Sequence, residues 1–379
     1  MAGRIGMTMV RKVEIVEAFD HFELVHRFSE TLSKLPVTVR FHLKEDYRSE
    51  MFEAYSHFNN LSYVSPPRGC SWQKYLESLT DGPDTLWIIT TVGRRPRWFY
   101  SLRAFSTLFI VLHDVNHGFS HYGGSHWLLG HLFNLRHWLN LSHHRALKKL
   151  MRASRGFLYP TERLCTYGHN LNCYSDKFHF VLPFSAQFTL DQEPETLKDT
   201  FRAVVPGSIR SSVKDYQLLL HALEIVTREL NRPLEIHFAG PIIDYSTSLQ
   251  IEATTAQMKG LHSTFYPTGL PYPEYEKLII SSHILISPLR PRANVGGVWE
   301  TLGQSKISGS FFDAIRYGKR LYVPEWYDPK VKELYRFSSA HDLGEKILQV
   351  MAADSLPIVN YSGYDRETVE RLWQQVLKQ

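Results

Sequence analysis

The sequence predicts an α/β protein of two domains, each built on a parallel sheet with helices on both faces. Strand-like and helix-like segments alternate through the first half, and the same alternation restarts near residue 200. The length of 379 residues exceeds what one ordinary core needs and suits two such domains. We therefore expect domains at 1–195 and 196–360, with a last segment at 361–379 that forms a helix.

The strand-like segments of the first half are short apolar runs, separated in several places by helical spacing. We expect strands at 13–18, 37–43, 61–64, 85–90, 109–112, 156–159 and 179–182, and helices at 22–35, 45–58 and 72–79. In the second half we expect strands at 201–205, 234–239, 264–267, 284–287 and 320–323, and helices at 215–230, 272–281, 308–317 and 366–377. The polar, acidic stretch 189–200 is interpreted as the linker.

Composition narrows the class of protein. Hydrophobic residues make up 43% and charged residues 21%, which is typical of a globular chain and excludes a disordered one. No apolar run approaches the roughly 20 residues of a membrane span, and the first twelve residues lack the apolar stretch of a secretory signal. With three cysteines a disulfide framework is not expected. These features predict a cytoplasmic protein.

The first informative motif is the segment 204–216, in which a strand runs into a glycine turn and then a helix. Backbone N–H groups at a helix start attract anions, and Arg210 and Lys214 add cationic donors beside Gly207. The pattern predicts a diphosphate site. An ordinary strand–turn–helix with solvated surface cations is the alternative.

The second motif is the segment 299–310. A carboxylate, Glu300, precedes a loop of small and hydroxyl-bearing residues that opens a helix. A carboxylate can accept hydrogen bonds from sugar hydroxyls, and the loop can hold phosphate. The candidate ligands in the loop are Gly303, Ser305, Lys306, Ser308 and Gly309. The alternative, a helix start capped by Ser308 or Ser310, is compatible with a phosphate site.

The segment 201–323 resembles the donor domain of GT-B glycosyltransferases, most closely the retaining enzymes of family 4. The resemblance rests on four pieces in order: 206–220, the strand 236–240 ending in Gly240, the helix and strand 272–287, and the loop and helix from Glu300 to Gly318. Family 4 typically has a second glutamate, separated from the first by seven intervening residues, and this chain has Ser308 at that position. Recognition of the nucleotide ribose is therefore expected to differ.

The resemblance implies two Rossmann-like domains facing a cleft, with the C-terminal helix returning to the first domain. It implies transfer of a hexose-type sugar from a nucleotide diphosphate sugar to a glycan, lipid-linked or small-molecule acceptor, as in polysaccharide biosynthesis. Retention of configuration and independence of any metal or other cofactor are also implied. Arg210 and Lys214 or Lys306 would neutralise the diphosphate leaving group, and Glu300 would bind sugar hydroxyls.

In the first half, His113 and Asp114 directly follow a buried strand-like segment. Polar residues at the carboxyl end of a parallel strand face the ligand-binding edge of the sheet, so His113 is a candidate for contact with the transferred sugar or the acceptor. A turn capped by His113 and Asp114 is the alternative. Further histidines follow at 117, 121, 126, 131 and 137. Their interleaved glycines disfavour a regular helix, so we expect an acceptor-contacting or solvated loop, with no metal ion.

Basic residues outnumber acidic ones strongly between residues 93 and 155, where Asp114 is the one acid. The basic, aromatic segment from Trp138 to Arg155 could contact the inner face of a membrane. A helix with its apolar face on the sheet and its cations in water is the alternative. Nucleic acid is not an expected partner. Two rival functions also remain: a sugar-nucleotide epimerase of the GT-B fold, and a non-catalytic GT-B protein that binds nucleotide sugars.

Overall fold

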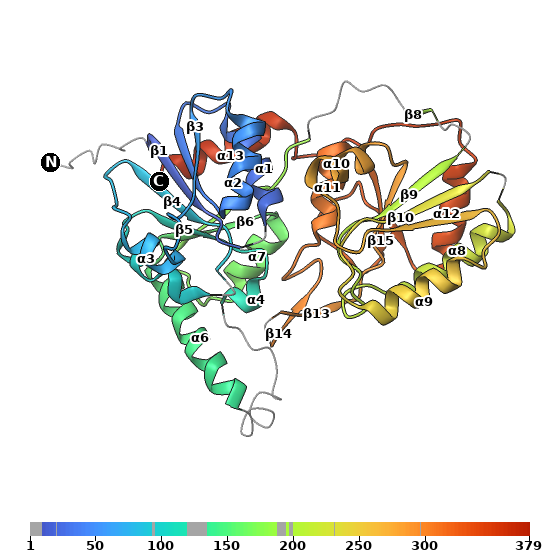
Figure 1. Ribbon diagram of the computed structural model, residues 1–379, viewed down its shortest axis with the longest axis horizontal. Helices are drawn as coiled ribbons and strands as arrows, with labels where there is room; N and C mark the ends of the chain where they lie inside the picture. The colour runs from blue at the N-terminus through green and yellow to red at the C-terminus, as the bar shows by residue number, and fades with distance from the viewer. Residues whose placement is uncertain are drawn as a thin grey trace. The chain divides into compact units, whose positions relative to one another are not determined.

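A computed structural model describes residues 10–19, 21–92, 95–119, 135–187, 195–196, 200–230, 232–295 and 297–379. The chain divides into two compact units (Figure 1). Unit 1 comprises Met1–Phe184, Asn294–Glu300 and Arg366–Gln379, and unit 2 comprises Ser185–Ala293 and Thr301–Asp365. Each unit contains one parallel sheet, as the sequence predicts.

The sheet of unit 1 has seven strands in the order β3-β2-β1-β4-β5-β6-β7, all parallel. The strands are β1 (Lys12–Val16), β2 (Thr38–His42), β3 (Leu61–Val64), β4 (Thr85–Ile89), β5 (Leu108–Val111), β6 (Gly156–Tyr159) and β7 (Phe178–Val181). The strands β1, β4, β5 and β6 are almost wholly buried, because helices cover both faces of a parallel sheet.

The helices of unit 1 include the last element of the chain. They are α1 (Phe22–Leu32), α2 (Glu45–Tyr55), α3 (Trp72–Glu77), η1 (Pro96–Phe99), η2 (Ser101–Ala104), α4 (Val115–Gly118), α6 (Leu135–Ala153), α7 (Glu162–Asn170) and α13 (Arg366–Leu377). Trp373 of α13 is fully buried, and its ring meets that of Phe28 in α1 edge to face at 5.1 Å. The terminal helix thus completes the core of unit 1.

The sheet of unit 2 has six parallel strands in the order β11-β10-β9-β12-β15-β16. They are β9 (Phe201–Val205), β10 (Leu234–Phe238), β11 (Leu261–Phe265), β12 (Ile284–Ile286), β15 (Arg320–Pro324) and β16 (Tyr335–Phe337). The helices are α8 (Tyr216–Arg228), α9 (Tyr245–Thr255), α10 (Tyr272–Ile280), α11 (Gly309–Tyr317) and α12 (Ala340–Met351). In each unit the strand order reverses beside the first strand, at β1/β4 and at β9/β12.

Two small two-stranded sheets complete the described structure. β13 (Arg292–Val295) pairs with β14 (Val298–Thr301), and β8 (Glu195–Thr196) pairs with β17 (Ser355–Leu356). The sequence interpretation missed the ribbon β13–β14, because it treated Glu300 as the residue before a loop. It also missed α9 and α12, and it placed the strand β11 three residues too late.

Candidate functional site

In unit 2 the order of strands reverses beside β9, and polar loops follow β9 and β12 at this point. Crevices at the carboxyl ends of strands, where the order reverses, are the usual ligand sites of open parallel sheets. The loop after β9 begins with Pro206 and Gly207, and Gly207 adopts a φ of 77°, a left-handed conformation that favours glycine. Ser287 directly follows β12. The first predicted motif therefore lies at the reversal point of this sheet.

Lys214 holds the loop after β9 in place. Its side chain is buried, and Nζ donates hydrogen bonds to the carbonyl oxygens of Pro206, Gly207 and Ser208 at 2.6, 2.8 and 3.0 Å. Burial, and secondarily the charge of Arg210, lowers the pKa of Lys214 to about 7. An ammonium has three N–H donors, and here three carbonyl oxygens accept them. The geometry gives Lys214 a role in shaping the loop.

Gly240, the other glycine predicted for this site, lies directly against the same loop. A Cβ atom at Gly240 would lie 2.3 Å from the carbonyl carbon of Gly207 and 2.5 Å from the backbone nitrogen of Ser208. No side chain can occupy that space without moving the loop. Gly240 thus lets the end of β10 approach the loop backbone, while Gly207 and Arg210 themselves remain exposed.

The second motif supplies the start of α11. Ser308 is the N-cap residue, and its side chain makes no capping hydrogen bond. Instead its hydroxyl lies 2.8 Å from that of Ser310, which in turn lies 2.9 Å from that of Ser287. Gly309 is exposed, and a Cβ built on it would meet no atom within 4 Å. The first turn of any helix has N–H groups without a partner inside the helix, so open space here exposes donors to an anion.

The turn before α11 contains the remaining predicted loop residues. Gly303 has a φ of 78°, and its N–H donates to the carbonyl oxygen of Lys306 at 2.7 Å. Ser305 is fully buried, and its hydroxyl accepts the N–H of Thr301 at 2.8 Å. Lys306 is half-buried at the end of this turn. Gly303 and Ser305 therefore shape the backbone that leads into α11.

Glu300 belongs to unit 1, whereas the loop residues that follow it belong to unit 2. Its carboxylate is fully buried and accepts the backbone N–H groups of His117 at 2.7 Å and Asn116 at 3.3 Å. Both groups belong to the first turn of α4, where N–H donors lack partners inside the helix. Asn116 Nδ2 also donates to the carbonyl oxygen of Trp299 at 2.9 Å. The carboxylate predicted to accept sugar hydroxyls therefore accepts backbone donors here.

His113 and Asp114 follow β5 at the carboxyl edge of the unit 1 sheet. His113 Nε2 lies 3.6 Å from Asp114 Oδ2, and both side chains are largely buried. Asp114 is the N-cap residue of α4, but its side chain makes no capping hydrogen bond. The side chain of Asp114 therefore does not cap this helix. The ring of His113 also contacts those of His21 and Phe184.

The later histidines bear on the question of a metal ion. His121, His126 and His131 lie outside the described residues, as does the side chain of His137. Among the residues that are described, no group of three or more histidine, cysteine, aspartate or glutamate side chains could hold a metal ion.

The basic segment forms the helix α6, described from Leu135 to Ala153. Leu147, Leu150 and Met151 are buried, while Lys148 and Lys149 are exposed. This part of the helix thus has its apolar face on the protein and its cations in solvent. In the part of the chain that the structure describes, no helix has the length and apolar character needed to cross a bilayer.

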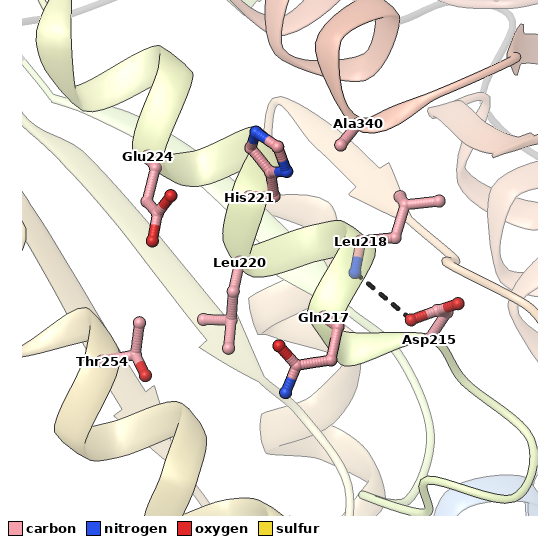
Figure 2. A pocket seen from close by; sticks show the side chains of 8 residues that line it. All are labelled: Asp215, Gln217, Leu218, Leu220, His221, Glu224, Thr254 and Ala340. Carbon is pink, nitrogen blue, oxygen red and sulfur yellow. Dashed lines mark hydrogen bonds between the residues drawn. The ribbon is translucent and has the colours of Figure 1, made fainter.

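A surface hollow of unit 2 lies along α8, where side chains from three helices line it (Figure 2). Its lining residues are Asp215, Gln217, Leu218, Leu220, His221, Glu224, Thr254 and Ala340. Asp215 accepts the N–H of Leu218 at 3.2 Å and thereby caps α8. No residue predicted to bind a ligand lines this hollow, so it is separate from the candidate site.

Several residues at the two reversal points were not singled out from the sequence. Glu17, Thr90 and Ser287 each directly follow a buried strand, at β1, β4 and β12. That position, a polar residue at the carboxyl end of a strand beside the reversal, is the signal that could have identified them. It requires the strand order, which the sequence interpretation did not predict.

Comparison with known proteins supports the architecture. No protein-family model matches the chain, and no curated protein matches it. Among solved structures, Anabaena HepE in complex with UDP and glucose matches with a TM-score of 0.57 and 9% identity, over 97% of this chain and 99% of HepE. The fold is GT-B. The N-terminal domain of Candida albicans trehalose-6-phosphate phosphatase matches with a TM-score of 0.53 and 10% identity, over 100% and 95% of the two chains.

A Listeria monocytogenes protein described as a putative UDP-N-acetylglucosamine 2-epimerase matches with a TM-score of 0.50 and 9% identity, over 95% of this chain and 91% of that one. At such identities these matches establish the fold and leave the activity open.

Proposed function

We propose that the protein is a glycosyltransferase that moves a hexose-type sugar from a nucleotide diphosphate sugar to a glycan, lipid-linked or small-molecule acceptor. The observation that carries the proposal is the start of α11, where exposed Gly309 and the hydroxyls of Ser308, Ser310 and Ser287 lie at the reversal point of the unit 2 sheet. Such an arrangement suits a diphosphate, because backbone N–H groups and hydroxyls donate to its oxygens. HepE, of the same fold, was solved with UDP and glucose.

Within this proposal the residues of unit 2 have distinct tasks. Arg210, exposed in the loop after β9, and Lys306, at the end of the turn before α11, supply positive charge to the diphosphate leaving group. Lys214, Gly240 and Gly303 fix the backbone around it. Stabilising the charge of the departing diphosphate is the main catalytic task in a reaction without a metal ion. We accordingly propose metal-independent transfer with retention of configuration, as the resemblance to family 4 implies.

In unit 1 we assign His113 to contact with a hydroxyl of the transferred sugar, supported by its place at the carboxyl edge of the sheet beside Asp114. Glu300 is proposed to support α4, which begins directly after these two residues, by accepting the N–H groups of its first turn.

We also propose that unit 1 binds peripherally to the anionic inner face of the cell membrane. The exposed cations Arg145, Lys148, Lys149, Arg152 and Arg155 favour this. Because the apolar side chains beside them are buried, the attraction would be electrostatic and would weaken with salt.

The test of the activity is a ligand screen followed by a transfer assay. Unfolding temperatures are measured with UDP, GDP, ADP, CDP and dTDP and with their sugars, each with and without EDTA. A ligand at 100 times its dissociation constant adds about 2.7 kcal/mol to stability. We expect one base to stabilise the protein, with no effect of EDTA, and its sugar to be transferred when acceptors are added.

The other outcomes separate the rivals. Conversion of the nucleotide sugar without any acceptor would identify an epimerase. Binding without turnover across many acceptors would identify a non-catalytic binding protein. Loss of stabilisation in EDTA would overturn metal independence.

A further inference from the structure

The reversal point of the unit 1 sheet contains a second polar cluster, built around Glu17. This carboxylate is fully buried directly after β1. Its Oε2 accepts the hydroxyls of Thr90 and Thr91, which follow β4, at 2.6 and 2.7 Å, and its Oε1 accepts the N–H of Phe19 at 2.7 Å. Glu17 therefore ties the ends of β1 and β4 together and holds the backbone of Phe19, two positions before His21 in the sequence.

His21 connects this cluster to His113. His21 Nδ1 lies 3.2 Å from Glu23 Oε1, and the ring centroids of His21 and His113 are 5.1 Å apart in an edge-on arrangement. His113 Nε2 also lies 3.6 Å from Asp114 Oδ2. The two histidines thus stand next to each other, and each has its own carboxylate.

The neighbouring charges favour the protonated form of His21. Partial burial alone would lower the pKa of His21, but the hydrogen bond and charge of Glu23, followed by the charges of Glu17 and Asp114, outweigh it and raise the pKa to about 9. His21 is therefore an imidazolium at neutral pH. His113 has both this cation and the carboxylate of Asp114 as neighbours, and the two act on its protonation in opposite directions.

We propose that His21 is a positioning residue that acts through His113. The carboxylate of Asp114 favours a second proton on His113. The imidazolium of His21, held by Glu23, counteracts that effect and keeps His113 neutral. This inference rests on the proposed glycosyltransferase function, in which His113 contacts the transferred sugar.

A neutral His113 suits that contact for two reasons. A neutral imidazole keeps one nitrogen lone pair that can accept a hydrogen bond, whereas an imidazolium has none. The transferred sugar also gains positive charge as its bond to the diphosphate breaks. A protonated His113 beside the sugar would repel that charge and destabilise the transition state.

The experiment is an NMR titration of the full chain with isotopically labelled histidine, in which the spectrum of His113→Gln identifies the signal of His113. In His21→Gln we expect the titration midpoint of His113 to rise by about one pH unit, because a cation about 5 Å away is removed. His21→Lys, which retains a positive charge, should leave the midpoint near its original value. Glu23→Gln should move it in the same direction as His21→Gln, because His21 then loses its proton more easily.

The matched control is His57→Gln, since His57 is an exposed histidine of the same unit. It should move no other midpoint. An unchanged midpoint of His113 in folded His21→Gln, or a wild-type His21 that loses its proton below pH 7, would overturn the inference.

The pH dependence of kcat distinguishes this inference from the proposed function. If both hold, the acid limb of the kcat profile shifts to higher pH in His21→Gln, together with the titration midpoint of His113. In His21→Lys the acid limb should lie at the same pH as in the wild type. A moved midpoint in a protein that transfers no sugar supports the coupling of the histidines and refutes the transferase. Transfer with an unmoved midpoint supports the transferase and refutes the coupling.

Discussion

Replacement of Gly309 by alanine tests the proposed phosphate site with little disturbance of the fold. The added methyl group would meet no atom within 4 Å, and alanine favours a helix over glycine, so stability should stay level or rise by roughly 0.5 kcal/mol. A phosphate oxygen must come close to the backbone of this turn to accept its N–H groups, and the methyl group occupies that approach. Loss of one charge-assisted hydrogen bond costs about 1.5–3 kcal/mol, which corresponds to a UDP dissociation constant raised about 10- to 140-fold.

The assay is isothermal titration of UDP, or of whichever diphosphate the screen identifies, with stability measured by urea unfolding. Gly344→Ala is the control for replacing a helical glycine outside the proposed site, because Gly344 lies in α12, where the Cβ would lie 3.1 Å from the carbonyl oxygen of Ala222. It should leave the affinity for the diphosphate unchanged. If Gly309→Ala and the bulkier Gly309→Val both bind the diphosphate as tightly as the wild type does, the start of α11 is not the phosphate site.

Three further predictions follow from contacts described above. Gly240→Ala forces the loop after β9 to move and should cost about 1–3 kcal/mol in urea unfolding while also weakening diphosphate binding; a wild-type unfolding midpoint would contradict the close approach. Glu300→Gln places an amide NH₂ group against the backbone N–H of Asn116 or His117, the two donors in the first turn of α4. It should lower the free energy of unfolding by about 1–3 kcal/mol and speed hydrogen exchange at both residues. If it instead weakens sugar-nucleotide binding with no change in exchange, Glu300 is a donor ligand. The pKa of His21, raised to about 9 from 6.5, stabilises the fold below pH 6.5, and this contribution is lost as the pH rises through 9. Because the side chain is 43% exposed, solvent screening reduces the contribution to roughly 1 kcal/mol, measurable as a stability difference from His21→Gln at pH 6 that shrinks by pH 10.

The fold class could be predicted from the sequence because its parallel strands are buried on both faces. Runs such as that of β4, in which every residue is buried, are nearly continuous in apolar residues and stand out between helical segments. The helix α9 was missed for the opposite reason. Its sequence, rich in serine and threonine, has little separation of apolar and polar faces, and Tyr245 and Leu249 are exposed.

The candidate site could be predicted only in part. Gly207 and Gly303 adopt positive φ angles, and Gly309 opens a helix, which the local pattern of strand, glycine turn and helix indicates directly. The partners of Glu300 and Lys214 could not be predicted in the same way. Glu300 accepts from residues more than 180 positions earlier, and Lys214 donates to carbonyl oxygens, which every residue type possesses and no sequence pattern marks.

The last helix has a consequence for how the protein is made. Unit 1 is discontinuous in the sequence, because its core includes Trp373 of α13, which follows the whole of unit 2. Unit 1 can complete its core only after α13 has been synthesised, whereas unit 2 includes no residue beyond Asp365 and does not wait for that helix. Premature termination near residue 365 would release a chain whose later half is folded and whose earlier half lacks a core residue, a species suited to recognition by chaperones and proteases.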